Sequence, residues 1–273
     1  MPEGPEIKFY YEHMKNLKGK KINSIEILSG RYINHPLGNI YTNLNKQLPL
    51  KIIDIGVKGK AIWWKLSNNT GIVFTHGMTG GWIFNSNSNN NSMYSREWFN
   101  KKYNRIKFVI GKKHLYFNDM RSFGTFQIYE NEELFIKKLD SIGPSVLEKP
   151  SKDIVYKELF RNPEKEIGIA LMEQDKISGI GNYLRADILW KSKISPHRLI
   201  KNLSIEDKAE LYKNIIKIPM KHFKYMIKYD KLYPDSRIKL FLVYSKDKDP
   251  YGNKVIRETL GNRTIHWVPS IQK

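Results

Sequence analysis

Apolar side chains near the start of the chain recur every three or four residues between Pro5 and Lys18, just before Gly19. Proline suits the first turn of a helix, and glycine is typical of its end. The pattern therefore predicts a helix over residues 5–18.

From residue 22 to about residue 130 the pattern changes to short runs rich in β-branched and aromatic residues, separated by turns that contain Gly and Asn. Runs of this kind predict an antiparallel sandwich or barrel. The polar stretch NSNSNNNS, Asn85–Ser92, is interpreted as a loop inserted between two strands. The predicted strands are Lys51–Val57, Ala61–Leu66, Gly71–Thr75, Arg105–Ile110, Leu115–Asn118 and Thr125–Tyr129.

The stretch DSIGPSVLEKP, residues 140–150, carries two prolines and a glycine and is typical of a linker. Helical patterns follow, the last from Ile205 to about Tyr229. A capping box, Ser204 with Asp207, precedes it, and Pro219 is expected to kink or split it. The other predicted helices are Ser151–Arg161, Glu166–Glu173 and Asn182–Lys191.

Strand-like runs return at the end of the chain, at Lys239–Tyr244, Lys254–Glu258 and Thr264–Val268, with Gly261–Asn262 as a hairpin turn. The chain is therefore expected to be an α+β protein of several domains. The expected divisions are a β domain with an N-terminal helix at 1–139, a linker at 140–150, a helical domain at 151–236 and a hairpin at 237–273.

The chain is strongly basic, with a net charge of +20 and an isoelectric point near 9.7. A polyanion such as nucleic acid is the first partner that this charge suggests. Solubility, or a composition rich in Lys and Asn, is the alternative explanation. Hydrophobic residues make up 40% of the chain, which is enough for a core and excludes a disordered basic tail.

The absence of cysteine excludes disulfides, thiolate zinc sites, iron–sulfur clusters and a cysteine nucleophile. The seven histidines are far apart in the sequence, so no local metal pair is present and no metal or cofactor is expected. No apolar run is long enough to span a membrane, and the first twenty residues lack the apolar core of a signal peptide. An intracellular protein is expected.

The opening, Met1-Pro2-Glu3-Gly4-Pro5-Glu6, carries candidate chemistry. Removal of Met1 would leave Pro2 with a free secondary amine, a nucleophile that forms an iminium on a sugar C1′. Glu3 beside it could shuttle protons, and Glu6 lies within a turn, at the positive end of the predicted helix. The alternative is that these residues only begin a helix.

A second element, Ser178-Gly179-Ile180-Gly181-Asn182-Tyr183-Leu184-Arg185, places two glycines and an asparagine at a predicted helix start. Backbone N–H groups and an amide at such a position suit a phosphate. Alone, this pattern also fits a tight turn between two helices.

Together these elements resemble the formamidopyrimidine-DNA glycosylase/endonuclease VIII family, to which the Pro-Glu-Gly-Pro-Glu opening is highly specific. The resemblance runs in order through the whole chain. Its further motifs are Val57-Lys58-Gly59-Lys60, His76-Gly77-Met78-Thr79-Gly80, Asp119-Met120-Arg121-Ser122-Phe123-Gly124, the Gly-Ile-Gly-Asn element and the C-terminal hairpin.

The resemblance implies a role for each matching residue. Pro2 would be the Schiff-base nucleophile, Glu3 the proton donor that opens the sugar, and Glu6 an assisting carboxylate. Lys60 would hold phosphates beside the lesion, and Asn182 would bind phosphate in a helix–two-turn–helix motif. Met78, Arg121 and Phe123 match residues that fill the space left by a flipped base. The alternatives are an ordinary turn lysine for Lys60, core packing for Met78 and Phe123, and a surface ion pair for Arg121.

The chain departs from the family pattern at its end. Many members carry a four-cysteine zinc finger after the Val-Tyr that matches Val243-Tyr244, whereas the corresponding segment here has no cysteine. A hairpin remains, with Arg263 in the phosphate-binding position of the finger, and it resembles the zincless finger of some endonuclease VIII-like members. Arg263 as a solvated turn residue is the alternative. Val255, Ile256, Ile265, Trp267 and Val268 are expected to pack this hairpin onto the helical domain.

The implied activity is that of a bifunctional DNA glycosylase/AP lyase of base excision repair, working by a Schiff base and β,δ-elimination. The short segment Tyr225–Arg237 favours oxidised pyrimidines, because the branch that prefers purines usually has a long loop there. The expected partner is damaged duplex or single-stranded DNA, and the expected state is a monomer. The rival hypotheses are a damaged-DNA-binding protein that has lost the chemistry and a structural RNA-binding protein.

Overall fold

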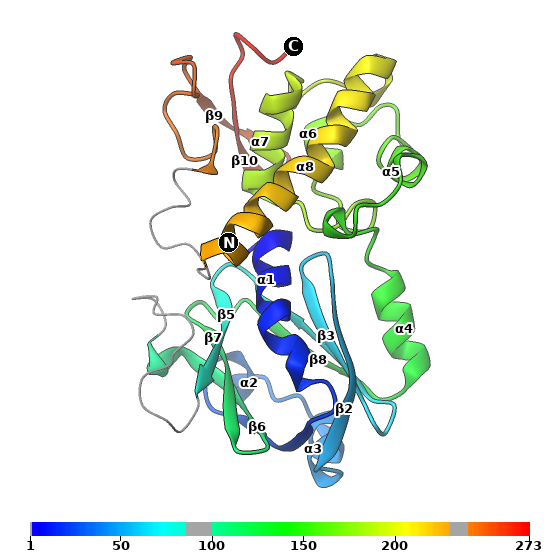
Figure 1. Cartoon of the computed structure of the whole chain (residues 1–273), viewed down its shortest axis with the longest axis vertical. Helices are drawn as coiled ribbons and strands as arrows, with labels where there is room; N and C mark the ends of the chain where they lie inside the picture. The colour runs from blue at the N-terminus through cyan, green and yellow to red at the C-terminus, as the bar shows by residue number, and fades with distance from the viewer. Residues whose placement is uncertain (1, 86–99, 230–239) are drawn as a thin grey trace. The chain divides into compact units, whose positions relative to one another are not determined.

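The computed structural model describes residues 2–85, 100–229 and 240–273. Met1, residues 86–99 and residues 230–239 lie outside these ranges, and with them most of the Asn85–Ser92 loop and most of the Tyr225–Arg237 segment. The chain divides into two compact units, shown with their elements in Figure 1. The first unit contains Met1–Pro2 and Ile7–Asp140, and the second contains Glu3–Glu6 and Ser141–Lys273.

The first unit is built on an eight-stranded antiparallel sheet with the strand order β5-β7-β6-β1-β2-β3-β4-β8. Each strand predicted in this region is present, with bounds that differ by at most two residues. The strands are β1 Lys21–Ile27, β2 Leu50–Lys58, β3 Ala61–Leu66, β4 Gly71–Thr75, β5 Gly80–Asn85, β6 Asn104–Ile110, β7 Lys113–Asp119 and β8 Thr125–Tyr129.

The two halves of this sheet face each other across an aromatic core. Trp64 and Phe74 belong to the half that contains β3 and β4. They contact Trp82 and Phe108 of the other half, with ring centroids 4.8–5.9 Å apart. All four side chains are fully buried. The joint between the halves, the β1–β2 pair, is short, so the sheet closes into the sandwich that the sequence predicted.

Two strands of the sheet, β1 and β5, were not specified by the sequence pattern. In β1 the pairing with β6 shifts between Ile22 and Ser24. This bulge breaks the alternation of buried and exposed positions that identifies a strand. The strand β5 opens with two glycines, Gly80 and Gly81, which are unfavourable in strands.

Short helices accompany the sheet. The N-terminal helix α1 presents Ile7, Phe9, Tyr10 and Met14 as fully or almost fully buried side chains. The helices of this region are α1 Gly4–Met14, α2 Arg31–Asn34, α3 Asn39–Lys46 and α4 Glu132–Asp140, with 3₁₀ helices η1 Lys15–Leu17 and η2 Lys101–Tyr103.

The second unit is helical. Its helices are η3 Val146–Glu148, α5 Lys152–Leu159, α6 Ile167–Ala170, α7 Asn182–Ser192, η4 Ile200–Asn202 and α8 Ile205–Tyr229. The predicted capping box is confirmed, because Ser204 N–H donates to Asp207 and Asp207 N–H donates to Ser204 Oγ. Val146 and Leu147, within the proline-containing stretch at 140–150, are buried in the core of this unit.

Of the two outcomes expected at Pro219, the split is wrong, because α8 continues through this residue, and the kink stays a prediction. Proline removes one backbone donor and so weakens a helix. In α8 the buried side chains Leu211, Ile215, Ile218 and Met226 lie on both sides of Pro219. Tertiary packing of this face stabilises the helix against the local preference of the proline.

A two-stranded hairpin, β9 Ile256–Leu260 and β10 Arg263–Trp267, ends the chain. Gly261 in its turn has a φ of +60°, a conformation that favours glycine. Of the five residues expected to pack the hairpin, Val255, Ile265 and Val268 are buried in a cluster with Trp190 of α7, and the partly buried Trp267 packs against it. Ile256 is only partly buried and lies outside this cluster, so the expectation does not hold for it.

The expected strand over Lys239–Tyr244 is wrong for its described residues. Instead of pairing with a strand, the backbone N–H groups of Leu242, Val243 and Tyr244 all donate to the carboxylate of Asp187 in α7, at 3.0–3.4 Å. These three N–H groups are therefore bonded to a buried carboxylate and are not available to pair with a neighbouring strand.

Candidate active site

The carboxylate of Glu3 lies at the N-terminus of α7, within the second unit. It accepts hydrogen bonds from the backbone N–H groups of Gly181 at 2.7 Å, Tyr183 at 2.9 Å and Leu184 at 3.3 Å. Glu3 has no exposed surface. The sequence predicted that this helix start binds a phosphate. In the structure its backbone N–H groups bind the Glu3 carboxylate instead.

Glycine is required where Glu3 approaches α7. A Cβ atom on Gly181 would lie 2.3 Å from Glu3 Cδ. The neighbouring glycines bring the two backbones together as well, because the Gly4 N–H donates to the Gly179 carbonyl at 2.8 Å. The backbone of residues 179–181 therefore packs directly against Glu3 and Gly4.

Glu6 is held beside Glu3 by Tyr183. The Tyr183 hydroxyl donates toward both Glu6 oxygens, at 3.0 and 3.2 Å, and the Glu3 backbone N–H donates to Glu6 Oε2 at 2.8 Å. The Tyr183 ring packs on His222 and Phe241, with centroids 5.2 and 4.9 Å away. Tyr183 thus positions both carboxylates, a role that the sequence pattern did not reveal.

Pro2 directly precedes Glu3 and is partly buried. It falls in the first unit, whereas Glu3 falls in the second. The peptide bond to Glu3 keeps the candidate nucleophile next to the candidate proton carrier.

Asn182 is the first residue of α7, and both ends of its amide are engaged. Its Nδ2 donates to the Thr264 carbonyl of β10 at 2.7 Å, and its Oδ1 accepts from Arg185 Nη2 at 2.6 Å. Arg185 also donates to Thr264 at 3.1 Å and to the Gly168 carbonyl at 3.1 Å. These contacts tie the helix start to the hairpin.

Arg185 is a buried cation, only 1% exposed. Burial lowers its pKa to about 10, while the Glu3 carboxylate raises the pKa and Arg263 lowers it. The guanidinium therefore stays charged at neutral pH. Its positive charge favours the ionised form of Glu3.

Arg263 begins β10 directly after the Gly261–Asn262 turn and is exposed. Its charge acts on Arg185. Arg185 therefore interacts with Asn182 at the start of α7 and with the charge of Arg263 near the tip of the hairpin.

Lys60 lies in the first unit, in the turn between β2 and β3, and is partly exposed. Gly59 before it has a φ of +57°, which allows the tight reversal. The position is that of a lysine in the turn before a strand, as predicted.

Met78, Arg121 and Phe123 form one exposed cluster in the first unit. The Arg121 guanidinium lies 4.6 Å from the Phe123 ring centroid, and its Nη1 is 3.2 Å from Met78 Sδ. Met78 is 36% exposed and Phe123 51% exposed, so neither packs in the core. The alternative of core packing does not hold for these two residues.

The loop that carries this cluster is organised by Asp119, which is fully buried. Its carboxylate accepts from the Gly124 N–H at 2.7 Å and from the Arg121 N–H at 3.2 Å, and also from the Thr79 hydroxyl. The first residue of the Asp-Met-Arg-Ser-Phe-Gly motif, Asp119, therefore fixes the backbone at Arg121 by hydrogen bonds.

Among the residues that the structure describes, no group of three or more His, Asp or Glu side chains is arranged to hold a metal ion. Within the same residues, no helix is long and apolar enough to cross a membrane.

The chain is similar to known proteins over nearly all of its length. Three family models match: the formamidopyrimidine-DNA glycosylase N-terminal domain over residues 1–126, its H2TH domain over 142–224 and its C-terminal domain over 231–273. The formamidopyrimidine-DNA glycosylase of Mycoplasma mobile is 32% identical over 221 residues, which cover 80% of this chain and 76% of the relative. The enzyme of Ureaplasma parvum is 28% identical over 290 residues, with 100% of both chains covered.

A solved structure shows the same fold. The Lactococcus lactis Fpg (MutM) in complex with DNA containing an oxidised pyrimidine matches with a TM-score of 0.81 and 22% identity, covering 100% of both chains. The narrower placement among endonuclease VIII-like members stays a prediction. From the family models and the relatives of 30% identity or more, this chain belongs to the formamidopyrimidine-DNA glycosylase family.

Proposed function

We propose that this protein is a bifunctional DNA glycosylase and AP lyase of base excision repair that removes oxidised bases, pyrimidines in preference. The observation that carries the proposal is the Glu3 carboxylate, which follows Pro2 in the chain and is fixed by three backbone N–H groups at the start of α7. A nucleophile and a proton carrier are the two groups that the reaction requires.

The proposed chemistry begins with Pro2 as the N-terminal residue. Its nitrogen attacks C1′ of the extruded nucleotide and passes its proton to Glu3, and the bond from C1′ to the base breaks with its electron pair leaving on the base. The ring oxygen O4′ then takes that proton from Glu3, and the sugar opens as an iminium. Loss of a C2′ proton then expels the 3′ phosphate, and a second elimination expels the 5′ phosphate, which leaves the strand cut on both sides.

The other candidate residues are proposed to bind DNA. Lys60, Asn182 and Arg263 would contact phosphates, and the exposed Met78, Arg121 and Phe123 would fill the space that the flipped nucleotide leaves. Insertion of apolar side chains and arginine into a base stack is a known way of stabilising distorted DNA. The exposure of Met78 and Phe123 supports this assignment.

The proposed organisation assigns catalysis to residues 1–139, DNA binding to 151–236 and the hairpin 237–273, with 140–150 between them. We propose that the hairpin is a zincless finger of the endonuclease VIII-like kind, working in a monomer. Its buried apolar cluster supplies the cohesion that a metal would otherwise give.

Borohydride trapping tests the proposal. The protein is incubated with oligonucleotides that contain an abasic site or an oxidised pyrimidine, reduced, and mapped by mass spectrometry. Crosslinking through the nitrogen of Pro2 supports the proposal, and crosslinking through a lysine side chain overturns the nucleophile. A chain that retains Met1 should bind the same DNA without being trapped.

The same assay separates the rival function. Binding of damaged DNA by the wild-type protein, without trapping or base release, would identify a damage-binding protein without chemistry. The salt dependence of binding adds a check on the phosphate contacts. About six contacts predict a slope of about −5 in log K against log salt, and Lys60→Ala should flatten it by about one.

A further inference from the structure

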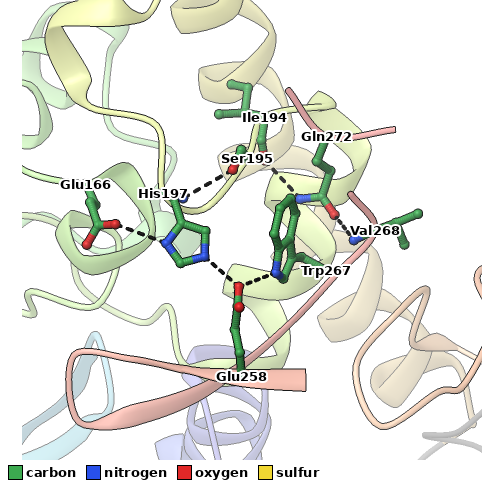
Figure 2. A network of polar contacts seen from close by, with 8 residues as sticks. All are labelled: Glu166, Ile194, Ser195, His197, Glu258, Trp267, Val268 and Gln272. Atoms are coloured by element: carbon green, nitrogen blue, oxygen red, sulfur yellow. Dashed lines mark hydrogen bonds and ion pairs between the residues drawn. The ribbon is translucent and has the colours of Figure 1, made fainter. Parts of the chain in front are cut away.

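A histidine outside the candidate active site links the helical part of the second unit to the hairpin, as Figure 2 shows. His197 lies between α7 and η4. Its Nδ1 is 3.0 Å from Glu166 Oε1, and its Nε2 is 2.5 Å from Glu258 Oε1. Glu166 is the N-cap residue of α6, and Glu258 lies on β9. Both ring nitrogens can donate only when the imidazole is protonated, so this geometry calls for the imidazolium form.

The surroundings of His197 support its charge. Burial lowers its pKa, but the hydrogen bonds and charges of Glu258 and Glu166 outweigh burial and raise the pKa above the usual 6.5. From β10, Trp267 faces the ring edge-on at 5.4 Å and donates its indole N–H to Glu258 Oε1. Other charged groups on the elements around the ring have partners of their own: Arg198 with Asp207, Lys165 with Glu173, Arg257 with Asp247, and Lys273 Nζ with the Pro269 carbonyl.

The element that His197 holds is a two-stranded hairpin, which is marginally stable alone in water. Near its turn, the Thr264 carbonyl accepts from Asn182 and Arg185. Farther from the turn, Glu258 in the middle of β9 is hydrogen-bonded to His197, and Trp267 at the end of β10 packs edge-on against its ring. Glu258 lies opposite Ile265 in the strand register, two residues from Arg263. The position of Glu258 therefore limits where Arg263 can lie.

We propose that His197 is a positioning residue for DNA binding: its doubly hydrogen-bonded imidazolium fastens β9 to the N-terminus of α6 and so holds Arg263 and the Thr264 carbonyl in place beside Asn182. The inference rests on the proposed function, because it takes the hairpin and Asn182 as parts of the DNA-binding surface.

The direction of the pH effect follows from the raised pKa. A histidine whose pKa is raised on folding stabilises the fold fully below its unfolded pKa and loses this contribution as the pH rises through the folded value. The hairpin should therefore loosen as the pH rises from 6 toward 9. Burial lowers the pKa of His76 to about 3 and the pKa values of His222 and His266 to about 4, so these three do not titrate in that window.

The first test uses the free protein. Nuclear magnetic resonance should show His197 titrating above pH 6.5, and Glu258→Gln should lower this midpoint. Glu164→Gln is the matched control: it removes one negative charge nearby, but Glu164 is 65% exposed and pairs with Lys201 rather than with the ring. Amide exchange in β9 and β10 should be faster in His197→Gln than in the wild type at pH 6. A midpoint below 6.5, or equal exchange in both proteins, would overturn the proposal.

The second test measures binding to a duplex with a stable abasic analogue, at one salt concentration, from pH 6 to 9. His197→Gln should bind about fivefold more weakly than the wild type at pH 6 and equally at pH 9, the size expected for a partly exposed charged pair. If the wild type binds and the pH profile of His197→Gln runs parallel to that of the wild type, the positioning role is refuted and the proposed function is not. Failure of the wild type to bind at any pH refutes the proposed function, and the positioning role with it.

Discussion

Replacement of Glu3 by glutamine should disturb the fold as well as the chemistry. The carboxylate accepts three backbone N–H groups, Tyr183 on Oε1 and both Gly181 and Leu184 on Oε2. Glutamine offers one acceptor oxygen, and its NH₂ group must then face at least one N–H donor. A hydrogen bond to a charged group contributes about 1.5–3 kcal/mol, and a charge at a helix N-terminus adds about 0.3–1 kcal/mol. Glu3→Gln should therefore lower the free energy of unfolding of the second unit by about 2–4 kcal/mol.

Hydrogen exchange is the suitable assay, because a single melting temperature is poorly defined for a chain with two compact units. The amides of Tyr183 and Leu184 should exchange faster in Glu3→Gln by a factor of about 30 or more, if they open with the helix start. Glu12→Gln is the matched control. It removes the same charge from α1, where Glu12 pairs with the half-exposed Lys15 at 2.8 Å, and it should leave both amides unchanged.

Wild-type exchange at Tyr183 and Leu184 in Glu3→Gln would refute this reasoning, because the carboxylate would then not cap α7 in solution. If exchange is faster, loss of base release in Glu3→Gln cannot be assigned to proton transfer alone. The rate of borohydride trapping has to be compared with the fraction of protein in which α7 remains formed.

Three further predictions follow from the same geometry. Gly181→Ala should abolish trapping, because its Cβ would lie 2.3 Å from Glu3 Cδ and displace the carboxylate; wild-type trapping would contradict this. Tyr183→Phe should cost about 1–3 kcal/mol in denaturant unfolding and slow base release, because Glu6 loses the hydroxyl donor at 3.0 Å; an unchanged stability would contradict it. Burial raises the pKa of Asp187 to about 6 from its ordinary 3.8. The folded state then binds this proton more tightly, so stability falls by about 3 kcal/mol in total as the pH rises from well below 3.8 to well above 6. Asp187→Asn should lack this part of the pH dependence of unfolding, and an identical profile would count against it.

Much of the fold was accessible from the sequence because its signals are local. The strands β3 and β4 have the predicted bounds, as does β8, since each is a short run bounded by turn residues. The capping box at Ser204 and the Gly261–Asn262 turn also depend only on neighbours in the chain. The wrong strand at Lys239–Tyr244 and the wrong split at Pro219 also share a cause. The Asp187 carboxylate and the buried face of α8 override the local pattern at Val243 and Pro219, and neither contact is visible in a short window of sequence.

The candidate site was predicted by residue but not by arrangement. Gly181 and Asn182 were identified as an anion-binding helix start, but backbone N–H groups favour any anion, and the sequence could not show that the anion is Glu3, 178 residues away. Tyr183 and Arg185 lay inside the quoted motif without a role, because the positions of their partners, Glu6 and Thr264, depend on the tertiary fold. His197 carried no motif at all, and only its distances to two carboxylates distinguish it from a surface histidine.

The arrangement around Glu3 also bears on the order of proton transfers in the proposed reaction. Each carboxylate oxygen accepts a backbone N–H, and the buried Arg185 adds a positive charge, so the ionised form is the one these groups favour. An ionised carboxylate must take up a proton before it can donate one. When the Pro2 amine adds to C1′ its nitrogen must lose a proton, and Glu3, the next residue, is an available acceptor. The same proton can then pass to O4′ as the sugar opens. In this order Glu3 acts as a base before it acts as an acid, and the helix start that stabilises its charge prepares it for the first of the two steps.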